Sequence, residues 1–158
     1  MSTLPSITVT GNGESPVGPV AGYIATRTMT AGKDDTALSE TPQSVTVVTR
    51  DQMNDQGAQT ITDALHYVAG VNTSAYGEDP RYDWITVRGF NQSVFGMYRD
   101  GLRASGSKIG MRIDSYGLER LEVLKGPSSV LYGQNSPGGL INACLLYTSP
   151  SPRDKRQS

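Results

Sequence analysis

The sequence predicts an α+β fold, with a small mixed β-sheet, short helices and long loops. Three observations indicate this class. Short β-favouring runs alternate with one clear helical pattern and one helical turn along the chain. Glycine and proline number 18 and 9 among 158 residues, which implies many turns and short elements. Apolar residues make up 36% and aromatic residues 7%, so we expect a small core.

The first 50 residues hold one predicted strand, preceded by polar sequence. Residues 1–22 are expected to be a flexible arm, since a Gly/Pro/Ser-rich linker follows one short β-favouring patch. Residues 23–43 are polar and expected to be extended. The run "PQSVTVVTR" (residues 42–50) predicts a strand because it is rich in valine and threonine. Asp51 and Asn54 are candidate caps for a short helix after it.

The helical pattern is clearest in "TITDALHYVAGV". Thr60 and Asp63 have the spacing of a capping box, and Gly70 is a natural end for the helix. His66 is expected to be a structural or surface residue of this helix. Apolar side chains at helical spacing form one predicted buried face: Ile61, Ala64, Leu65 and Val68.

Polar loops and short strands fill the next segment. The stretch "NTSAYGEDPRYD" predicts a loop, and "WITVRGF" predicts a strand that ends at Gly89. The stretch "FGMYRDGLRA" predicts a hairpin, because Asp100-Gly101 is a strong two-residue turn signal between β-favouring runs. The stretch "SGSKIGMRIDSYG" is expected to be a loop.

The stretch "LERLEVLKGPSSVLYGQNSPGGLIN" predicts a strand, a helical turn and a final strand. Alternation places Leu121 and Val123 on one face of the first strand, and Glu122 and Leu124 on the other. Gly126-Pro127 ends that strand. The glycines that follow, Gly133, Gly138 and Gly139, permit positive φ and close backbone approach.

The strand pattern is expected to stop at Ala143. From Cys144 the sequence "CLLYTSPSPRDKRQS" is rich in serine, proline and basic residues. We expect residues 144–158 to be a non-native tail and residues 23–143 to form the domain.

Composition disfavours several classes of function. With 14 basic and 15 acidic residues, the chain lacks the basic excess typical of nucleic-acid binding, and we expect no nucleic-acid partner. One cysteine allows no internal disulfide, and one histidine allows no histidine cluster for zinc or non-haem iron. No apolar run reaches the ~20 residues of a membrane-spanning helix, and the N-terminus lacks a signal-peptide pattern.

Catalytic alternatives find little support. A phosphate-binding P-loop needs Lys-Ser or Lys-Thr directly after its last glycine, whereas Gly133 is followed by Gln134. No Gly-x-Ser-x-Gly motif is present for a hydrolase. A glycosidase pair formed by Glu119 and Glu122 stays open from sequence alone. We expect no enzyme, no catalytic residue, no cofactor and no protein metal ligand.

Six motifs occur in one order and spacing: "TPQSVTVVTRDQM", "DALHYVAGV", "ITVRGF", "YRDGLR", "LERLEVLKGPSSVLYG" and "SPGGLIN". Together, over roughly residues 7–143, they resemble the plug domain of TonB-dependent outer-membrane receptors, in the ferric-siderophore branch that includes the ferrichrome receptor. The resemblance implies a plug folded inside a β-barrel that follows in the same chain, so we expect a plug fragment. It also implies an outer-membrane location, with the arm facing the periplasm, and a ferric siderophore as transported ligand.

The resemblance implies TonB as a partner of the arm. The segment Ile7, Thr8, Val9 and Thr10 resembles the TonB box. An extended β-favouring segment can add a strand to an exposed sheet edge, and main-chain hydrogen bonds then carry the affinity. A proline there would remove a donor and should be the worst substitution.

The resemblance also implies two further sets of site residues. The ferrichrome receptor's pattern has a binding arginine where Tyr76 stands, and Phe95 is expected at a hairpin tip. Arg88 and Lys125 match positions whose arginines face barrel glutamates in the family. The predicted ligand-binding residues are Tyr76, Arg81, Tyr82, Phe95, Lys108 and Ile109. Receptors for vitamin B12, haem or sugar, and a free plug-like binding module, stay open as alternatives.

Overall fold

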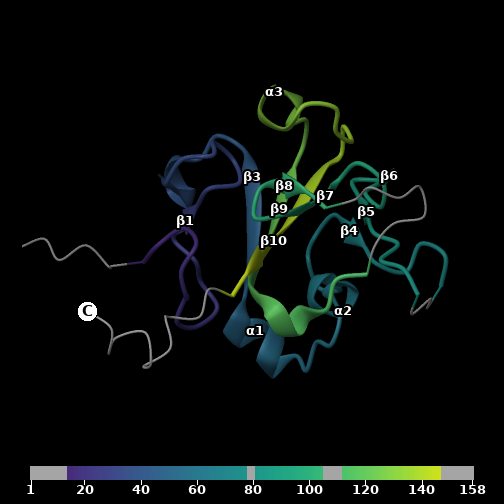
Figure 1. Cartoon of the computed structure of the whole chain (residues 1–158), viewed down its shortest axis with the longest axis horizontal. Coiled ribbons are helices and arrows are strands. Elements are labelled where there is room, and N and C mark those ends of the chain that lie inside the picture. Colours follow the sequence, from purple (N-terminus) through teal and green to yellow (C-terminus); the bar gives the residue numbers. More distant parts are fainter. Residues whose placement is uncertain (1–13, 78–80, 105–111, 147–158) are drawn as a thin grey trace, which may run out of the picture.

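The computed structural model describes residues 14–77, 81–104 and 112–146 (Figure 1). The strands are β1 (Arg27–Thr28), β2 (Thr36–Ala37), β3 (Ser44–Thr49), β4 (Val71–Asn72), β5 (Thr86–Val87), β6 (Phe90–Asn91), β7 (Met97–Arg99), β8 (Leu102–Arg103), β9 (Leu118–Lys125) and β10 (Gly139–Leu145). The helices are α1 (Arg50–Asp55), α2 (Ile61–Leu65) and α3 (Ser129–Tyr132), with 3₁₀ helices at Leu38–Glu40 and Ser115–Gly117.

A five-stranded mixed sheet, in the order β3-β9-β10-β7-β8, forms the centre of the molecule. Strand β9 pairs antiparallel with β3 on one side and with β10 on the other. Strand β10 also pairs parallel with β7, and β7 and β8 form a hairpin. Figure 1 shows the long strands β3, β9 and β10 side by side at the centre. The predicted α+β class with a mixed sheet and short helices is confirmed.

One face of this sheet carries the main apolar core. Leu121 and Val123 of β9 point to this face, as the alternation predicts, and Ile141 of β10 is the register partner of Val123. Helices α1 and α2 cover the face. Their buried apolar residues, with one from the turn after α2, are Met53, Ile61, Ala64, Leu65 and Val68. The predicted buried face of the helical segment is therefore confirmed.

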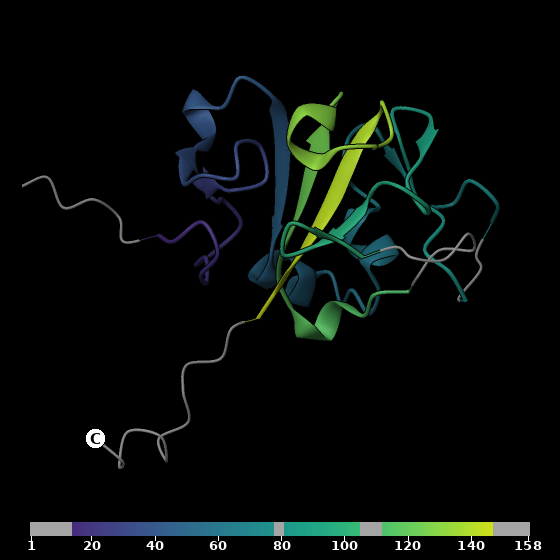
Figure 2. The ribbon, with the colours of Figure 1, turned by 45° about the horizontal axis from the view of Figure 1, so that its top comes forward.

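The opposite face of the sheet packs against the N-terminal segment, residues 14–33. Leu124 and Leu140 are register partners here and form a second cluster with Tyr98 and Tyr132. Ala31 packs on this cluster. Figure 2 shows the N-terminal segment and the small sheet β4-β5-β6 on opposite sides of the central strands. Strand β9 is consequently buried on both faces, including the charged residues Glu119, Arg120 and Glu122, and only Lys125 at its end is partly exposed.

Two hairpins depend on left-handed backbone at their turns. Asp100 and Gly101 have φ values of 48° and 77°, which confirms the predicted turn between β7 and β8. The stretch "WITVRGF" was expected to be one strand, and this is wrong. It forms β5 and the start of β6, joined by Arg88 and Gly89 with φ values of 50° and 84°. A non-glycine residue in this region is uncommon.

The helix caps agree in part with the sequence. The capping box is present, since Thr60 Oγ1 accepts from the Asp63 amide and the Asp63 carboxylate accepts from the Thr60 amide. Helix α2 ends at Leu65, earlier than expected, and His66 is its C-cap residue with an exposed side chain. The N-cap of α1 is Thr49 rather than Asp51 or Asn54, because Thr49 Oγ1 accepts from the Gln52 amide.

Both predicted boundaries of the domain differ from the observed packing. Residues 14–22, expected to belong to a flexible arm, are attached to the domain through hydrogen bonds to Glu119 and Asp51. Strand β10 continues beyond Ala143, where it was expected to stop. Cys144 and Leu145 pair with Arg120 and Leu118 across a register shift. The origin of residues 144–158 stays a prediction.

Candidate functional site

An aromatic cluster lies beside the small sheet, where the predicted ligand residues Tyr76 and Tyr82 flank Trp84. The ring of Trp84 makes edge contacts with Tyr76 at 5.3 Å and with Tyr82 at 6.1 Å between ring centroids. Tyr76 is 71% exposed, so most of its ring is available for stacking. The guanidinium of Arg81 lies 5.9 Å from the centre of the Tyr82 ring, within range of a cation–π contact.

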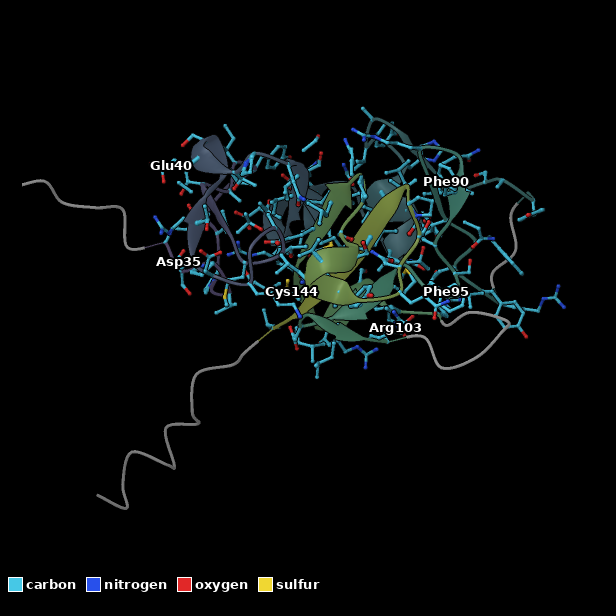
Figure 3. All side chains as sticks on the ribbon, turned by 90° about the horizontal axis from the view of Figure 1, so that it is seen from above. Asp35, Glu40, Phe90, Phe95, Arg103 and Cys144 are labelled. Carbon is cyan, nitrogen blue, oxygen red and sulfur yellow. The ribbon has the colours of Figure 1, made fainter. Side chains whose placement is uncertain are left out.

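Phe95 was expected at a hairpin tip, but it does not lie at one. It belongs to the turn that connects β6 to β7, closed by the Gly96 amide donating to the Gln92 carbonyl at 2.9 Å. Its ring is 42% exposed and lies 5.7 Å from the guanidinium of Arg103. Figure 3 shows Arg103 beside Phe95, with Phe90 on the same side of the molecule and Asp35 and Glu40 on the other.

Sequence reasoning missed two residues of this region, Trp84 and Arg103. Trp84 was assigned to a strand, although it is the only tryptophan of the chain. Arg103 is the register partner of Tyr98 across the Asp100-Gly101 turn, and that pairing could have been read from the turn position. Within the described ranges no ring contact joins Phe95 to the Trp84 cluster. Lys108 and Ile109 lie outside the described residues.

A groove of about 630 Å³ runs from the aromatic cluster towards the turn between α1 and α2. Its walls combine aromatic rings with hydroxyl and carboxylate groups. They include Thr60, Asp63, His66, Ser74, Tyr82 and Trp84. Such a mixture of rings and a few polar groups suits a chelate or another partly polar ligand.

Arg88 and Lys125 are brought close together by the turn after β5 and the end of β9. Arg88 is exposed, and Lys125 is partly buried. Burial lowers the pKa of Lys125, and the neighbouring Arg88 lowers it further. Among the described residues neither cation has a carboxylate within salt-bridge distance. Two adjacent cations of this kind are suited to an anionic group supplied from outside the described residues.

Glycines allow this turn to pack closely against the start of β10. A Cβ atom on Gly138 would overlap the main-chain oxygen of Val87 and contact Phe90. Gly139 has φ 137°, and a Cβ atom added there would overlap the main-chain oxygen of Leu124. The predicted need for close backbone approach at these two glycines is confirmed.

Arg120, on the central strand, attaches the N-terminal segment to the sheet. It is fully buried and donates to three main-chain carbonyls: through Nη2 to Ser15 at 2.9 Å and Gly18 at 2.5 Å, and through Nη1 to Arg27 at 3.2 Å. Its Nη1 also lies 3.6 Å from Glu122 Oε1.

Glu122 is 1% exposed and holds the same segment through hydroxyl groups. Its Oε2 accepts from Thr28 Oγ1 at 2.6 Å and from Thr30 Oγ1. Glu119 accepts from the Val20 amide at 3.3 Å. Both carboxylates of the possible glycosidase pair thus hold the N-terminal segment, which gives them a structural role.

A second cavity, of about 420 Å³, lies between the N-terminal segment and the sheet. Val17, Met29 and Lys33 form one wall, and Tyr132 and Cys144 belong to the other. Burial raises the pKa of the Cys144 thiol well above its usual range, which disfavours the nucleophilic thiolate.

Two general features of the described residues limit the chemistry. They contain no group of three or more His, Cys, Asp or Glu side chains that could hold a metal ion. None of the helices in residues 14–77, 81–104 and 112–146 is long and apolar enough to cross a membrane.

Comparisons with known proteins agree on one family. The family model for the TonB-dependent receptor plug domain matches residues 37–140. The ferrioxamine receptor of Yersinia enterocolitica is 45% identical over 139 residues, which is 85% of this chain and 19% of that protein. The ferrichrome outer membrane transporter/phage receptor of Escherichia coli K12 is 40% identical over 143 residues, 88% of this chain and 19% of that protein.

Solved structures agree with this. The crystal structure of the ferripyoverdine receptor of the outer membrane of Pseudomonas aeruginosa, bound to ferripyoverdine, matches with a TM-score of 0.66. Its sequence identity is 33%, and the match covers 79% of this chain and 16% of that one. The chain thus spans about a fifth of the length of the curated relatives that it matches.

Proposed function

Because the chain belongs to the TonB-dependent receptor plug domain family, we propose that it is the plug of a receptor that carries a ferric siderophore across the outer membrane. The family match over residues 37–140 carries this proposal. The names of the relatives support the ligand class, because they describe receptors or transporters for ferrioxamine and ferrichrome rather than enzymes.

The ligand is proposed to contact the aromatic cluster and the turn before β7. Tyr76 and Tyr82 offer ring faces, and Arg81 offers a cation beside one of them. Phe95 with Arg103 offers the same combination at the second position. Rings and cations suit the flat, partly anionic ligand groups of a ferric chelate, whose iron is already saturated by the siderophore.

The two cations Arg88 and Lys125 are proposed to pair with carboxylates of the β-barrel that the family resemblance implies. Their mutual repulsion, together with the lowered pKa of Lys125, supports this, since an anionic partner would relieve both. Arg88 also keeps a left-handed φ of 50°, a conformation that costs energy at a non-glycine residue.

TonB is proposed to pair with Ile7–Thr10, which lie outside the described residues, and to pull on the chain from there. The attachment of residues 14–33 supports this route for force. Arg120 and Glu122 connect this segment directly to β9, the strand between β3 and β10 in the central sheet. A pull on the N-terminal segment would therefore load the centre of the domain.

The proposal is tested by exchanging plugs. The matching plug of the Yersinia enterocolitica ferrioxamine receptor would be replaced by residues 1–143 of this chain, in a strain that lacks its own receptor. We expect uptake of radiolabelled ferric ferrioxamine B, and no uptake when Val9 is replaced by proline. Absence of uptake for hydroxamate and catecholate chelates alike, at a normal amount of folded chimera in the outer membrane, would contradict the proposal.

A further inference from the structure

Asp83 lies where three segments meet, two of which carry candidate ligand residues. Its side chain is almost completely buried, since the residue is 3% exposed. Its Oδ2 accepts from the Ile113 amide at 2.7 Å, and its main-chain oxygen accepts from Ser93 Oγ at 3.1 Å. It also stands directly between Tyr82 and Trp84 in the chain.

Two of these three segments carry residues that the sequence predicts to contact ligand. Arg81 and Tyr82 precede Asp83 in the first segment, and Phe95 follows Ser93 in the second. Ile113 belongs to the third segment. Asp83 therefore connects both ligand-bearing segments with the segment of Ile113.

The charge of Asp83 is costly in this position. Burial raises the pKa of its carboxyl group to about 6, and the Ile113 amide and Arg112 oppose this only in part. The other charged groups that act on it are Asp114, in the same segment as Arg112, and Asp63 of α2, and both raise its pKa further. Ile113, whose amide bonds Asp83, and Ile85, two residues after Asp83 in the chain, are themselves buried and apolar.

We infer that Asp83 is a positioning residue, which holds the three segments together through its two hydrogen bonds. Because its ionised side chain is poorly solvated there, the segments can also separate. The relevance to ligand rests on the proposed function, whereas the junction itself can be tested without any ligand. An asparagine would keep an acceptor for the Ile113 amide at a lower cost of burial. The carboxylate therefore makes the closed junction less stable than an asparagine would, and the three segments separate more easily.

The direction of the pH effect follows from linkage. If separation of the segments hydrates Asp83, its pKa returns towards the ordinary value of 3.8, below the value of about 6 in the closed junction. Protonation then favours the closed junction. Between pH 7 and pH 5 the ratio of closed to open forms should rise about tenfold, the limit for full hydration on opening.

Amide hydrogen exchange of the whole chain, followed by NMR and corrected for intrinsic exchange rates, measures this ratio at Ile113. We expect the protection of the Ile113 amide to rise about tenfold between pH 7 and pH 5. Asp83→Asn should show high protection at both pH values. Asp114→Asn, which removes a nearby carboxylate that does not bond Ile113, should keep the pH dependence.

A second variant separates the junction from general unfolding. Asp83→Ala should lower the protection of the Ile113 amide while the amides of Leu121 and Ile141 in the central sheet stay protected. The inference is overturned if protection at Ile113 is independent of pH in the unmodified chain, or if Asp83→Asn changes with pH in the same way. It is also overturned if Asp83→Ala leaves Ile113 protected.

The role of Asp83 in ligand positioning is tested by measuring the binding of ferric ferrioxamine B to the chimeric receptor described above, in which residues 1–143 of this chain replace the plug of the Yersinia enterocolitica receptor. Asp83→Ala should weaken its binding about tenfold, while Asp83→Asn should bind like the parent. Equal binding by the parent receptor, Asp83→Ala and Asp83→Asn refutes the positioning role. Failure of the parent receptor to bind the probe would count against the proposed function, and the exchange measurement would still decide whether the junction exists.

Discussion

Replacing Arg120 by methionine should release the N-terminal segment and destabilise the domain. Methionine fills a similar volume without a charge, so the change removes the donors and little of the packing. Three main-chain carbonyls, those of Ser15, Gly18 and Arg27, lose their guanidinium donor. Glu122 loses the cation 3.6 Å away and stays buried.

The expected loss of stability is large for a domain of this size. Leaving a buried partner of an ion pair uncompensated costs about 3–5 kcal/mol, and whole domains are stable by only about 5–15 kcal/mol. We expect the free energy of unfolding of Arg120→Met to fall by about 3–5 kcal/mol. Glu122→Gln in the same chain should restore part of this loss, because the unpaired charge disappears.

Urea unfolding followed by circular dichroism gives the free energies, and hydrogen exchange shows where protection is lost. The loss should concentrate in residues 14–33. Arg27→Met is a matched control, since Arg27 pairs with Asp35 at the surface and should cost less than about 1 kcal/mol. The reasoning is refuted if Arg120→Met costs no more than this control, or if residues 14–33 keep their protection.

Three further predictions concern single positions. The pKa of Asp83, raised from 3.8 to about 6, means that its contribution to stability is complete below about pH 4 and is lost as the pH rises through 6; Asp83→Asn should therefore flatten the unfolding free energy between these values, and an unchanged slope would contradict the assignment. Gly138→Ala should destabilise the domain by about 1–3 kcal/mol, because a Cβ atom would overlap the Val87 carbonyl, whereas Gly117→Ala, with nothing near its Cβ position, should cost much less in the same urea titration. Cys144 should react slowly with iodoacetamide in the native chain and faster in Arg120→Met, because the N-terminal segment covers its cavity; equal rates in both would show that the segment does not protect it.

Local sequence signals correctly predicted those elements that depend on interactions between residues close together in the chain. The capping box of Thr60 and Asp63 needs only a three-residue spacing, and the Asp100-Gly101 turn needs only two adjacent residues. Alternation along β9 placed Leu121 and Val123 correctly, since a strand has a period of two.

The turn inside "WITVRGF" escaped prediction for a physical reason. Arg88 adopts a left-handed φ although arginine has no preference for it, and Arg-Gly is not among the strong hairpin signals. The β-favouring residues on either side then suggest one continuous strand.

The role of Arg120 and Glu122 could not be read from their own neighbourhood. Charged residues alternating along a strand normally indicate a solvated face. Here the partners are main-chain and hydroxyl groups that lie 92 to 105 residues away in the chain. Only the tertiary structure reveals that this face is covered by residues 14–33.

The most direct test of the account is calorimetric titration of the whole chain with the periplasmic domain of TonB from Yersinia enterocolitica and from Escherichia coli. We predict saturable binding, lost in Val9→Pro and kept in Val9→Ala, because main-chain hydrogen bonds carry the affinity and only proline removes a donor. Absence of binding to both domains, or equal binding by Val9→Pro, would contradict the claim that this plug is operated by TonB through Ile7–Thr10.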